Sequence, residues 1–282
     1  MPIYEETYRP WHGHTVTHPR THWVIGKTGF KLLWKRSMIL LLIMANLNFV
    51  VRAVQIYIMN RVGDAANALP AAQGFRIDAG FFMKFIQNQV FLFVIVMIFA
   101  GAGIIANDRK FKALSIYFSK PLSFWDYIGG KAMVMSAYGL LVTLIPGWAL
   151  FLTAVLMDKD STLFNAFWWV PLSMAGSVLV LLVAWVAVVM ALSALSNSTR
   201  TAAILSAGIF LFPEMLRAIL SRIPNVGLFS LQAVCRQINA ACFGRPLPYD
   251  FSPWLGGGLL VLLVAACVAI LKWRVRPTEV VR

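Results

Sequence analysis

Residues 170–195 read VPLSMAGSVLVLLVAWVAVVMALSAL, and residues 85–106 read FIQNQVFLFVIVMIFAGAGIIA. Neither stretch contains Asp, Glu, Lys or Arg. A helix needs about 20 apolar residues to cross the roughly 30 Å hydrocarbon core of a bilayer. A core helix of a soluble domain does not require so long an uncharged run. The two stretches therefore predict membrane-spanning helices.

The rest of the chain repeats this pattern. Of the 282 residues, 60% are hydrophobic and only 13% are charged, whereas about a quarter would be charged in a soluble domain. The apolar blocks predict six spans, at residues 37–59, 85–106, 132–156, 170–195, 202–220 and 254–272. We expect an all-α, polytopic membrane protein with one six-helix domain over residues 23–272, between cytoplasmic tails at 1–22 and 273–282.

The net charge of +14 admits two explanations, nucleic-acid binding or the basic loops of a membrane protein. The basic residues lie at the ends of the spans, and no long basic stripe with interleaved aromatics occurs. The lipid bilayer is therefore the expected partner, and nucleic acid is not. With the N-terminus inside, inner segments hold 16 Lys and Arg and outer segments 8, with Arg52 inside the first span. This bias predicts a bacterial inner-membrane protein with both termini in the cytoplasm.

Two segments outside the spans have helical patterns. Residues 23–36, WVIGKTGFKLLWKR, alternate aromatic and basic side chains and predict an amphipathic helix in the membrane interface. The alternative is an ordinary cluster of charges beside the membrane. The outer segment 221–253 is half apolar, which predicts one or two short re-entrant helices in the outer leaflet.

Cysteine and histidine give no site. Cys235 and Cys242 lie two helical turns apart, too far for a disulfide, and Cys267 lies in an apolar span, so free thiols are expected. No metal site is predicted, because the histidines lie in a tail without a nearby cysteine or a fixed geometry. They are His12, His14, His18 and His22. Catalytic motifs are absent from the sequence, so no catalytic residue is predicted.

The inner loop 107–131, NDRKFKALSIYFSKPLSFWDYIGGK, is longer than a connector requires. Its first half predicts a short helix that ends before Pro121. Ser123 is expected to cap a second short helix over residues 124–128, which Gly129 and Gly130 would end.

Exposed aromatics on these two short helices would form a docking surface for a cytosolic partner. The alternative is that the loop folds back against its own spans. The residues predicted to dock the partner are Arg109, Leu114, Tyr117, Phe118, Pro121, Phe124, Trp125 and Tyr127.

Polar residues inside the spans are few. Asn48, Arg52 and Gln55 share one face of the first span, which predicts a polar stripe on a translocation path. The alternative is that Arg52 extends to the outer headgroups. Glu214 and Arg217, three residues apart, are expected to form a structural ion pair at the outer rim.

The inner loop also carries a family resemblance. Asp108-Arg109-Lys110, Lys112-Ala113-Leu114, the run from Tyr117 to Ser123 and Gly130-Lys131 resemble the permeases of type-two ABC exporters. The resemblance implies a permease that pairs with a second copy, as a homodimer, and docks on an ATP-binding subunit. Loop 107–131 would then be the coupling helix.

This chain is not expected to be an enzyme. Gly26-Lys27-Thr28 resembles the end of a phosphate-binding loop, but position 21 is Thr where the pattern requires Gly. No cofactor is expected in this chain, and ATP and Mg²⁺ would bind to the partner subunit. Two alternative functions remain open, a membrane scaffold of a secretion or maturation complex and an intramembrane lipid-modifying enzyme.

Overall fold

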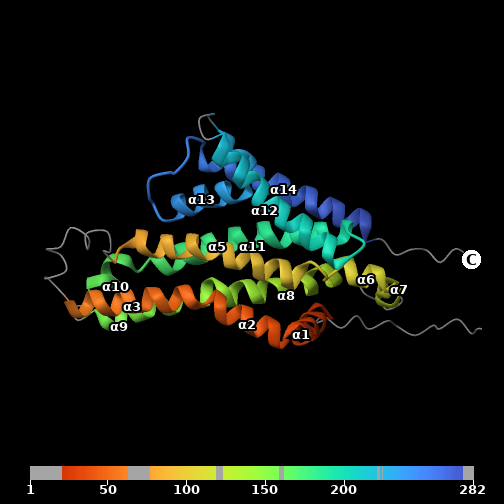
Figure 1. Cartoon of the computed structure of the whole chain (residues 1–282), viewed down its shortest axis with the longest axis horizontal. Helices are drawn as coiled ribbons and strands as arrows, with labels where there is room; N and C mark the ends of the chain where they lie inside the picture. Colours follow the sequence, from red (N-terminus) through yellow and green to blue (C-terminus); the bar gives the residue numbers. More distant parts are fainter. Residues whose placement is uncertain are drawn as a thin grey trace, which may run out of the picture.

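The structure is a computed structural model that describes residues 21–62, 77–118, 123–158, 162–220, 223 and 225–275, which fold into helices without a strand among them (Figure 1). In the first half of the chain the helices are α1 (Thr21–Leu33), α2 (Arg36–Ala45), α3 (Leu47–Val62), α5 (Ala79–Gly101), α6 (Ala106–Lys110), α7 (Ala113–Phe118) and α8 (Phe124–Val142). In the second half they are α9 (Leu144–Met157), α10 (Thr162–Phe167), α11 (Val170–Leu195), α12 (Thr199–Ile219), the short 3₁₀ helix η2 (Val226–Phe229), α13 (Leu231–Cys242) and α14 (Pro253–Arg274).

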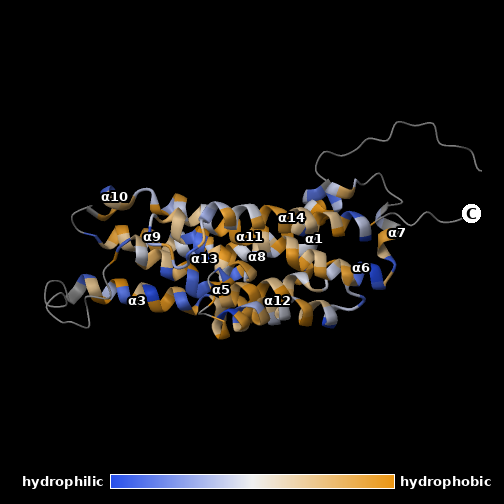
Figure 2. Ribbon diagram, turned by 90° about the horizontal axis from the view of Figure 1, so that it is seen from above, coloured by the Kyte–Doolittle hydropathy of each residue, from blue (hydrophilic) through white to orange (hydrophobic). Residues whose placement is uncertain are grey.

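Six helical segments of the described chain are long and apolar enough to cross a membrane, which confirms the predicted number of spans. They are Arg36–Asn60, Ala79–Lys110, Phe124–Met157, Leu163–Leu195, Thr199–Ile219 and Pro253–Arg274. Hydrophobic residues cover most of the spans, and hydrophilic residues lie near α6 and α10 at the two ends and also on α3 and α13 (Figure 2). We call the end with α1, α6, α7 and the last turn of α14 the loop end.

The core is centred on α5 and α11, the two most buried spans. Large side chains without exposed surface from α5, α8 and α11 belong to this core, among them Phe85, Phe93, Tyr138 and Trp185. Gly139 of α8 permits this close approach, because a Cβ there would lie 2.4 Å from the Leu182 side chain. The spans at the edge of the bundle are less buried, and only 17% of the first and of the fifth is buried within the chain.

The third span begins earlier than predicted. The expected short helix over residues 124–128 does not end at Gly129 and Gly130, because α8 runs through both glycines to Val142. Neither glycine has the left-handed backbone of a helix end, and Gly130 instead lies against α1. Ser123 caps this longer helix in a reciprocal capping box with Asp126, as expected from its position before the aromatic run.

The segments outside the spans form helices where the sequence predicted them. α1 covers most of the predicted interfacial segment, and Figure 1 shows it turned out of the direction that the spans share. η2 and α13 lie in the segment predicted to be re-entrant. Gln237 of α13 donates to the carbonyls of Tyr249 and Phe251, which fixes the loop before α14. The depth of α1 and α13 in the bilayer stays a prediction.

Candidate functional site

The second span is interrupted just before the predicted docking loop. α5 ends at Gly101, residues 102–105 form turns, and α6 begins at Ala106. Ser193 of α11 bridges this elbow, because its hydroxyl accepts the N–H groups of Ile105 and Ala106 at 3.1 and 3.0 Å and donates to the Ala102 carbonyl at 2.8 Å. An interrupted helix leaves backbone groups unpaired, and unpaired groups are costly in an apolar bundle. One hydroxyl therefore satisfies three backbone groups and fixes the elbow to α11.

An ion pair joins α6 to α8. The Lys131 ammonium lies 2.8 Å from the Asp108 carboxylate, and their side chains are only 13% and 17% exposed. The Tyr127 hydroxyl donates to the same carboxylate at 2.7 Å. The Lys131 ammonium also lies within 6 Å of the rings of Tyr117 and Tyr127. Burial, and to a smaller extent the charge of Asp108, raises the pKa of the Tyr117 phenol.

Two further contacts join α6 to the hairpin of α11 and α12. The Thr199 hydroxyl donates to the Asn107 side chain at 2.7 Å, and the Arg109 guanidinium donates to the Ala194 carbonyl. Ser198 caps the start of α12 by accepting the N–H of Thr201. Side-chain contacts thus join the short helix α6 to α8, α11 and α12, and the elbow at residues 102–105 connects it to α5. A force on α6 would reach four spans directly.

The predicted docking residues divide into exposed and buried groups. Trp125 is 58% exposed, and Phe111, which the prediction did not include, is 70% exposed. Leu114, Tyr117 and Phe124 are half-buried against the core, and Arg109 is half-buried. The expected exposure of Tyr127 is wrong, because its ring has no exposed surface. Pro121 and the side chain of Phe118 lie outside the described residues.

The loop therefore has both buried and exposed aromatic residues, and docking of a partner on it stays a prediction. Leu114, Tyr117, Phe124 and Tyr127 fold back on the spans, as the alternative proposed. Trp125 and Phe111 leave apolar surface exposed at the loop end. The Lys272 ammonium at the end of α14 lies 5.1 Å from the centre of the Trp125 ring, which places basic charge beside this surface.

The polar residues of the first span lie on the side that faces α5. Asn48 donates to Gln89 at 3.0 Å, and Arg52 donates to Gln55 at 3.1 Å. The Arg52 guanidinium also lies 5.1 Å from the centre of the Phe81 ring of α5. All three predicted path residues are half-buried. Their role in translocation stays a prediction.

Gln89 is a central polar residue that the sequence analysis did not single out. It is completely buried, and its side-chain N–H groups donate to the carbonyls of Ala45 and Val142 at 2.6 and 2.9 Å. Ala45 is the last residue of α2 and Val142 the last of α8. Pro146 lacks the N–H that would otherwise bond the Val142 carbonyl four residues before it. The run Gln87-Asn88-Gln89 in an otherwise apolar span, with a proline in another span, is the signal that could have pointed to this site.

The predicted ion pair between Glu214 and Arg217 is present near the C-terminal end of α12. Glu214 accepts hydrogen bonds from Arg217 at 2.7 Å and from Arg236 at 3.1 Å, and the Ser230 hydroxyl donates to it at 2.9 Å. These bonds link α12 to α13 and to the turn before α13. The pair between Glu214 and Arg217 is therefore structural, as expected.

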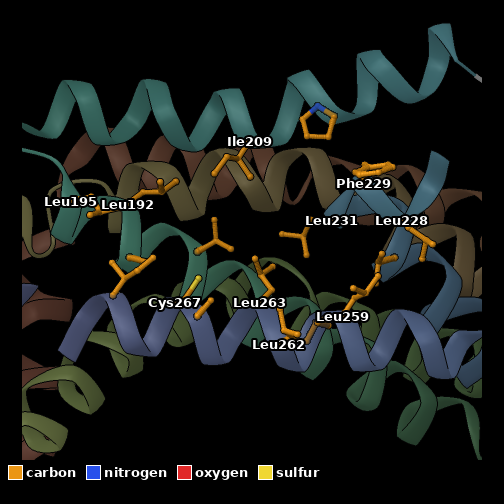
Figure 3. Close-up of a pocket in the computed structure, with 17 residues that line it drawn as sticks. Leu192, Leu195, Ile209, Leu228, Phe229, Leu231, Leu259, Leu262, Leu263 and Cys267 are labelled. Carbon is orange, nitrogen blue, oxygen red and sulfur yellow. The ribbon is translucent and has the colours of Figure 1, made fainter. Parts of the chain in front are cut away.

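An apolar cleft lies between α11, α12 and α14, with η2 and α13 at one end (Figure 3). Its volume is about 450 Å³, and its lining is apolar, including Leu192, Ile209, Leu263 and Cys267. The cleft contains neither a carboxylate nor a histidine, so it offers no acid–base pair for catalysis. Elsewhere in the described residues, no three His, Cys, Asp or Glu side chains gather as a metal site. Cys235, Cys242 and Cys267 are free thiols, as expected.

Comparison with known proteins agrees with this arrangement. A search of curated proteins gave no match to the chain. The family model described as "ABC-2 family transporter protein" matches residues 31–225, which include the first five spans and the whole inner loop. This match covers well over half of the sequence. The chain therefore belongs to the ABC-2 family of transporter proteins.

Proposed function

We propose that this chain is the permease subunit of an ATP-driven exporter, with α6, α7 and the start of α8 as the docking site for a separate ATP-binding subunit. Membership of the ABC-2 family makes the chain a multi-pass membrane component of an ABC transporter. Export as the direction of transport, and docking at the loop end, are the steps that we add. ATP and Mg²⁺ would bind to the partner subunit.

This proposal rests on the contacts that α6 and its elbow make with α8, α11 and α12, which we call the α6 junction. A coupling element must receive a partner on one side and hold the transport helices on the other. Phe111 and Trp125 supply exposed apolar surface for the first task. The bonds of Ser193, Lys131 and Thr199 to α6 and its elbow supply the second, because they connect this surface to four spans.

Photocrosslinking in the native cell tests the docking step. A photoreactive phenylalanine at position 111 or 125 should crosslink to a protein that mass spectrometry identifies as an ABC ATP-binding subunit. The matched control is position 229, because Phe229 is 77% exposed but lies in η2, in the segment predicted to be on the outer side. Equal crosslinking from 111, 125 and 229, or none from 111 and 125, would contradict the proposal.

The purified complex separates this function from the two alternatives. An exporter should hydrolyse ATP, and W125A should reduce ATP hydrolysis per copy of the permease. A membrane scaffold would co-purify with proteins that lack an ATP-binding domain. A lipid-modifying enzyme would retain its activity without any ATPase, and the apolar cleft of Figure 3 offers no catalytic pair for it.

A second copy of the chain would complete the translocation path. The first and fifth spans are only 17% buried within one chain, and both carry large apolar side chains such as Val51 and Phe212 on exposed surface. We place the path between two copies of spans one, two and five, where Asn48, Arg52 and Gln55 would face it. Mass measurement of the purified permease in detergent should give twice the chain mass.

The membrane orientation has its own test. Both termini and the loop end would lie in the cytoplasm of a bacterial cell, with α10 on the periplasmic side. Lys110 is exposed on α6, so in a C242S background K110C should react with an impermeant maleimide only after the cells are opened. F164C in α10 is the matched control, and it should react in intact cells.

A further inference from the structure

A groove at the loop end lies between α1 and α8. It encloses about 610 Å³, and we call it the α1–α8 groove. Its apolar lining consists of Trp23 and Phe30 from α1, Trp34 directly after α1, and Met133, Val134 and Ala137 from α8. Lys27 and Lys31 also line it. None of the contacts described for the α6 junction involves these two lysines.

Close helix contact makes the groove rigid. A Cβ on Gly26 would lie 2.9 Å from the Met133 sulfur, and one on Gly29 would lie 2.8 Å from Val134. Glycines at this crossing let the two backbones approach closely. Tyr138 of α8 also holds α1 in place, because its hydroxyl donates to the Phe30 carbonyl at 3.1 Å and its ring stacks on the Phe30 ring with 4.7 Å between the ring centroids. The groove therefore forms within one chain and does not need a ligand to shape it.

The groove also has uncompensated positive charge. Lys27 and Lys31 are exposed and lie one turn apart on α1, which contains no acidic residue. In the described part of the chain neither ammonium has an ion-pair partner. On α8, the Asp126 carboxylate is engaged by the N–H and hydroxyl of Ser123 and lies 3.9 Å from the His22 ring. Lys35, between α1 and α2, and Arg36, the first residue of α2, add to the positive charge.

We propose that the α1–α8 groove binds one anionic phospholipid, with an acyl chain against Met133, Val134 and Ala137 and the phosphate bound by Lys27 and Lys31. Trp23 and Trp34 suit the headgroup level of a bilayer, because indole rings favour the boundary between lipid and water. A free phosphate ion would use the two lysines and leave the apolar groove empty. An uncharged lipid would fill the groove and leave the lysines unpaired. Only an anionic lipid satisfies both halves of the site.

Native mass spectrometry of the purified full-length protein tests this site. The protein would be titrated with phosphatidylglycerol, with phosphatidylcholine of the same acyl chains, and with inorganic phosphate. We expect one phosphatidylglycerol per chain to be retained at concentrations where phosphatidylcholine is lost. Lipid phosphate near the surface gains about 1 kcal/mol from each Lys. K27Q/K31Q should therefore weaken retention by about 30-fold, the equivalent of about 2 kcal/mol.

Two controls assign the effect to the groove. K84Q/K110Q removes the same charge from exposed lysines elsewhere and should leave retention unchanged. A137W fills the apolar half without altering charge and should also abolish retention, whereas A218W on exposed α12 should not. Equal loss in K84Q/K110Q, no loss in A137W, or displacement of the lipid by inorganic phosphate would overturn the proposal. So would a change of oligomeric mass in A137W with lipid retention intact, because the groove would then hold a protein segment. None of these outcomes depends on transport or on the ATP-binding subunit.

Discussion

The ion pair between Asp108 and Lys131 makes a quantitative prediction about the α6 junction. At 2.8 Å, and with an effective dielectric constant of about 20, the attraction between the charges is about 6 kcal/mol before desolvation is subtracted. Both side chains are mostly buried, so removing one partner leaves the other charge without compensation. We expect D108N to lower the free energy of unfolding by about 3 kcal/mol. Asn keeps an acceptor for the Tyr127 hydroxyl, so the loss reports mainly on charge.

The double variant provides the decisive comparison. K131M alone should also cost about 3 kcal/mol, but D108N/K131M removes both charges and should cost no more than either single change. The interaction energy in this cycle should therefore be about 3 kcal/mol. Unfolding in mixed micelles by increasing SDS, followed by tryptophan fluorescence, measures all four proteins.

The chain contains a matched control pair. Arg245 and Asp78 also form an ion pair, but their side chains are 35% and 41% exposed. The same cycle with R245Q and D78N should give an interaction energy of less than about 1 kcal/mol. Additive effects of D108N and K131M, within about 0.5 kcal/mol, would refute the argument that burial makes the Asp108 pair strong.

Three further predictions concern packing, buried hydrogen bonds and thiols. G139V should lower the free energy of unfolding by about 2 kcal/mol, since even a Cβ would lie 2.4 Å from the Leu182 side chain, and SDS unfolding measures it. Q89L should lower the free energy of unfolding by about 2 kcal/mol in the same assay, because two backbone carbonyls lose their donor. Q89E would present only acceptors to these carbonyls and should be at least as destabilising. Burial raises the pKa of the Cys235 thiol to about 12, so its maleimide labelling should be slow at pH 8 and should accelerate as pH rises, while half-exposed Cys242 reacts first. Mass spectrometry of the labelled peptides distinguishes the two thiols, and rapid labelling of Cys235 in the folded protein would show that it is accessible.

The spans could be predicted from sequence because hydropathy is local information. An uncharged run such as residues 170–195 has few stable alternatives to a membrane helix, and α11 has those bounds in the structure. The cap at Ser123 was predictable for the same reason, since a capping box involves only neighbours in sequence. The predicted helix end at Gly129 and Gly130 was wrong, because the sequence alone does not distinguish a glycine at a helix end from a glycine at a helix crossing.

The site itself was only partly predictable. Trp125 and Tyr127 are both aromatic residues of the same loop, so the sequence does not show that the first is exposed and the second buried. That difference depends on where α6 and α7 fold. Ser193 bonds to residues about ninety positions away in sequence, so its role in the elbow requires the tertiary structure. Gln89 was visible as one of three consecutive amide residues in span two, but the carbonyls that it meets belong to two other spans.

The position of Gln89 also bears on how the permease bends. Spans one and three are each divided, at Asn46 and at Thr143, and the Gln89 carboxamide donates to the carbonyl that ends the first helix of each, Ala45 of α2 and Val142 of α8. Each of these two spans therefore consists of two shorter helices that meet beside Gln89, and the span is least stiff at that break. Because the Gln89 amide donates a hydrogen bond to the carbonyl at each break, tilting one helix against the next brings neither water nor an unpaired carbonyl into the lipid.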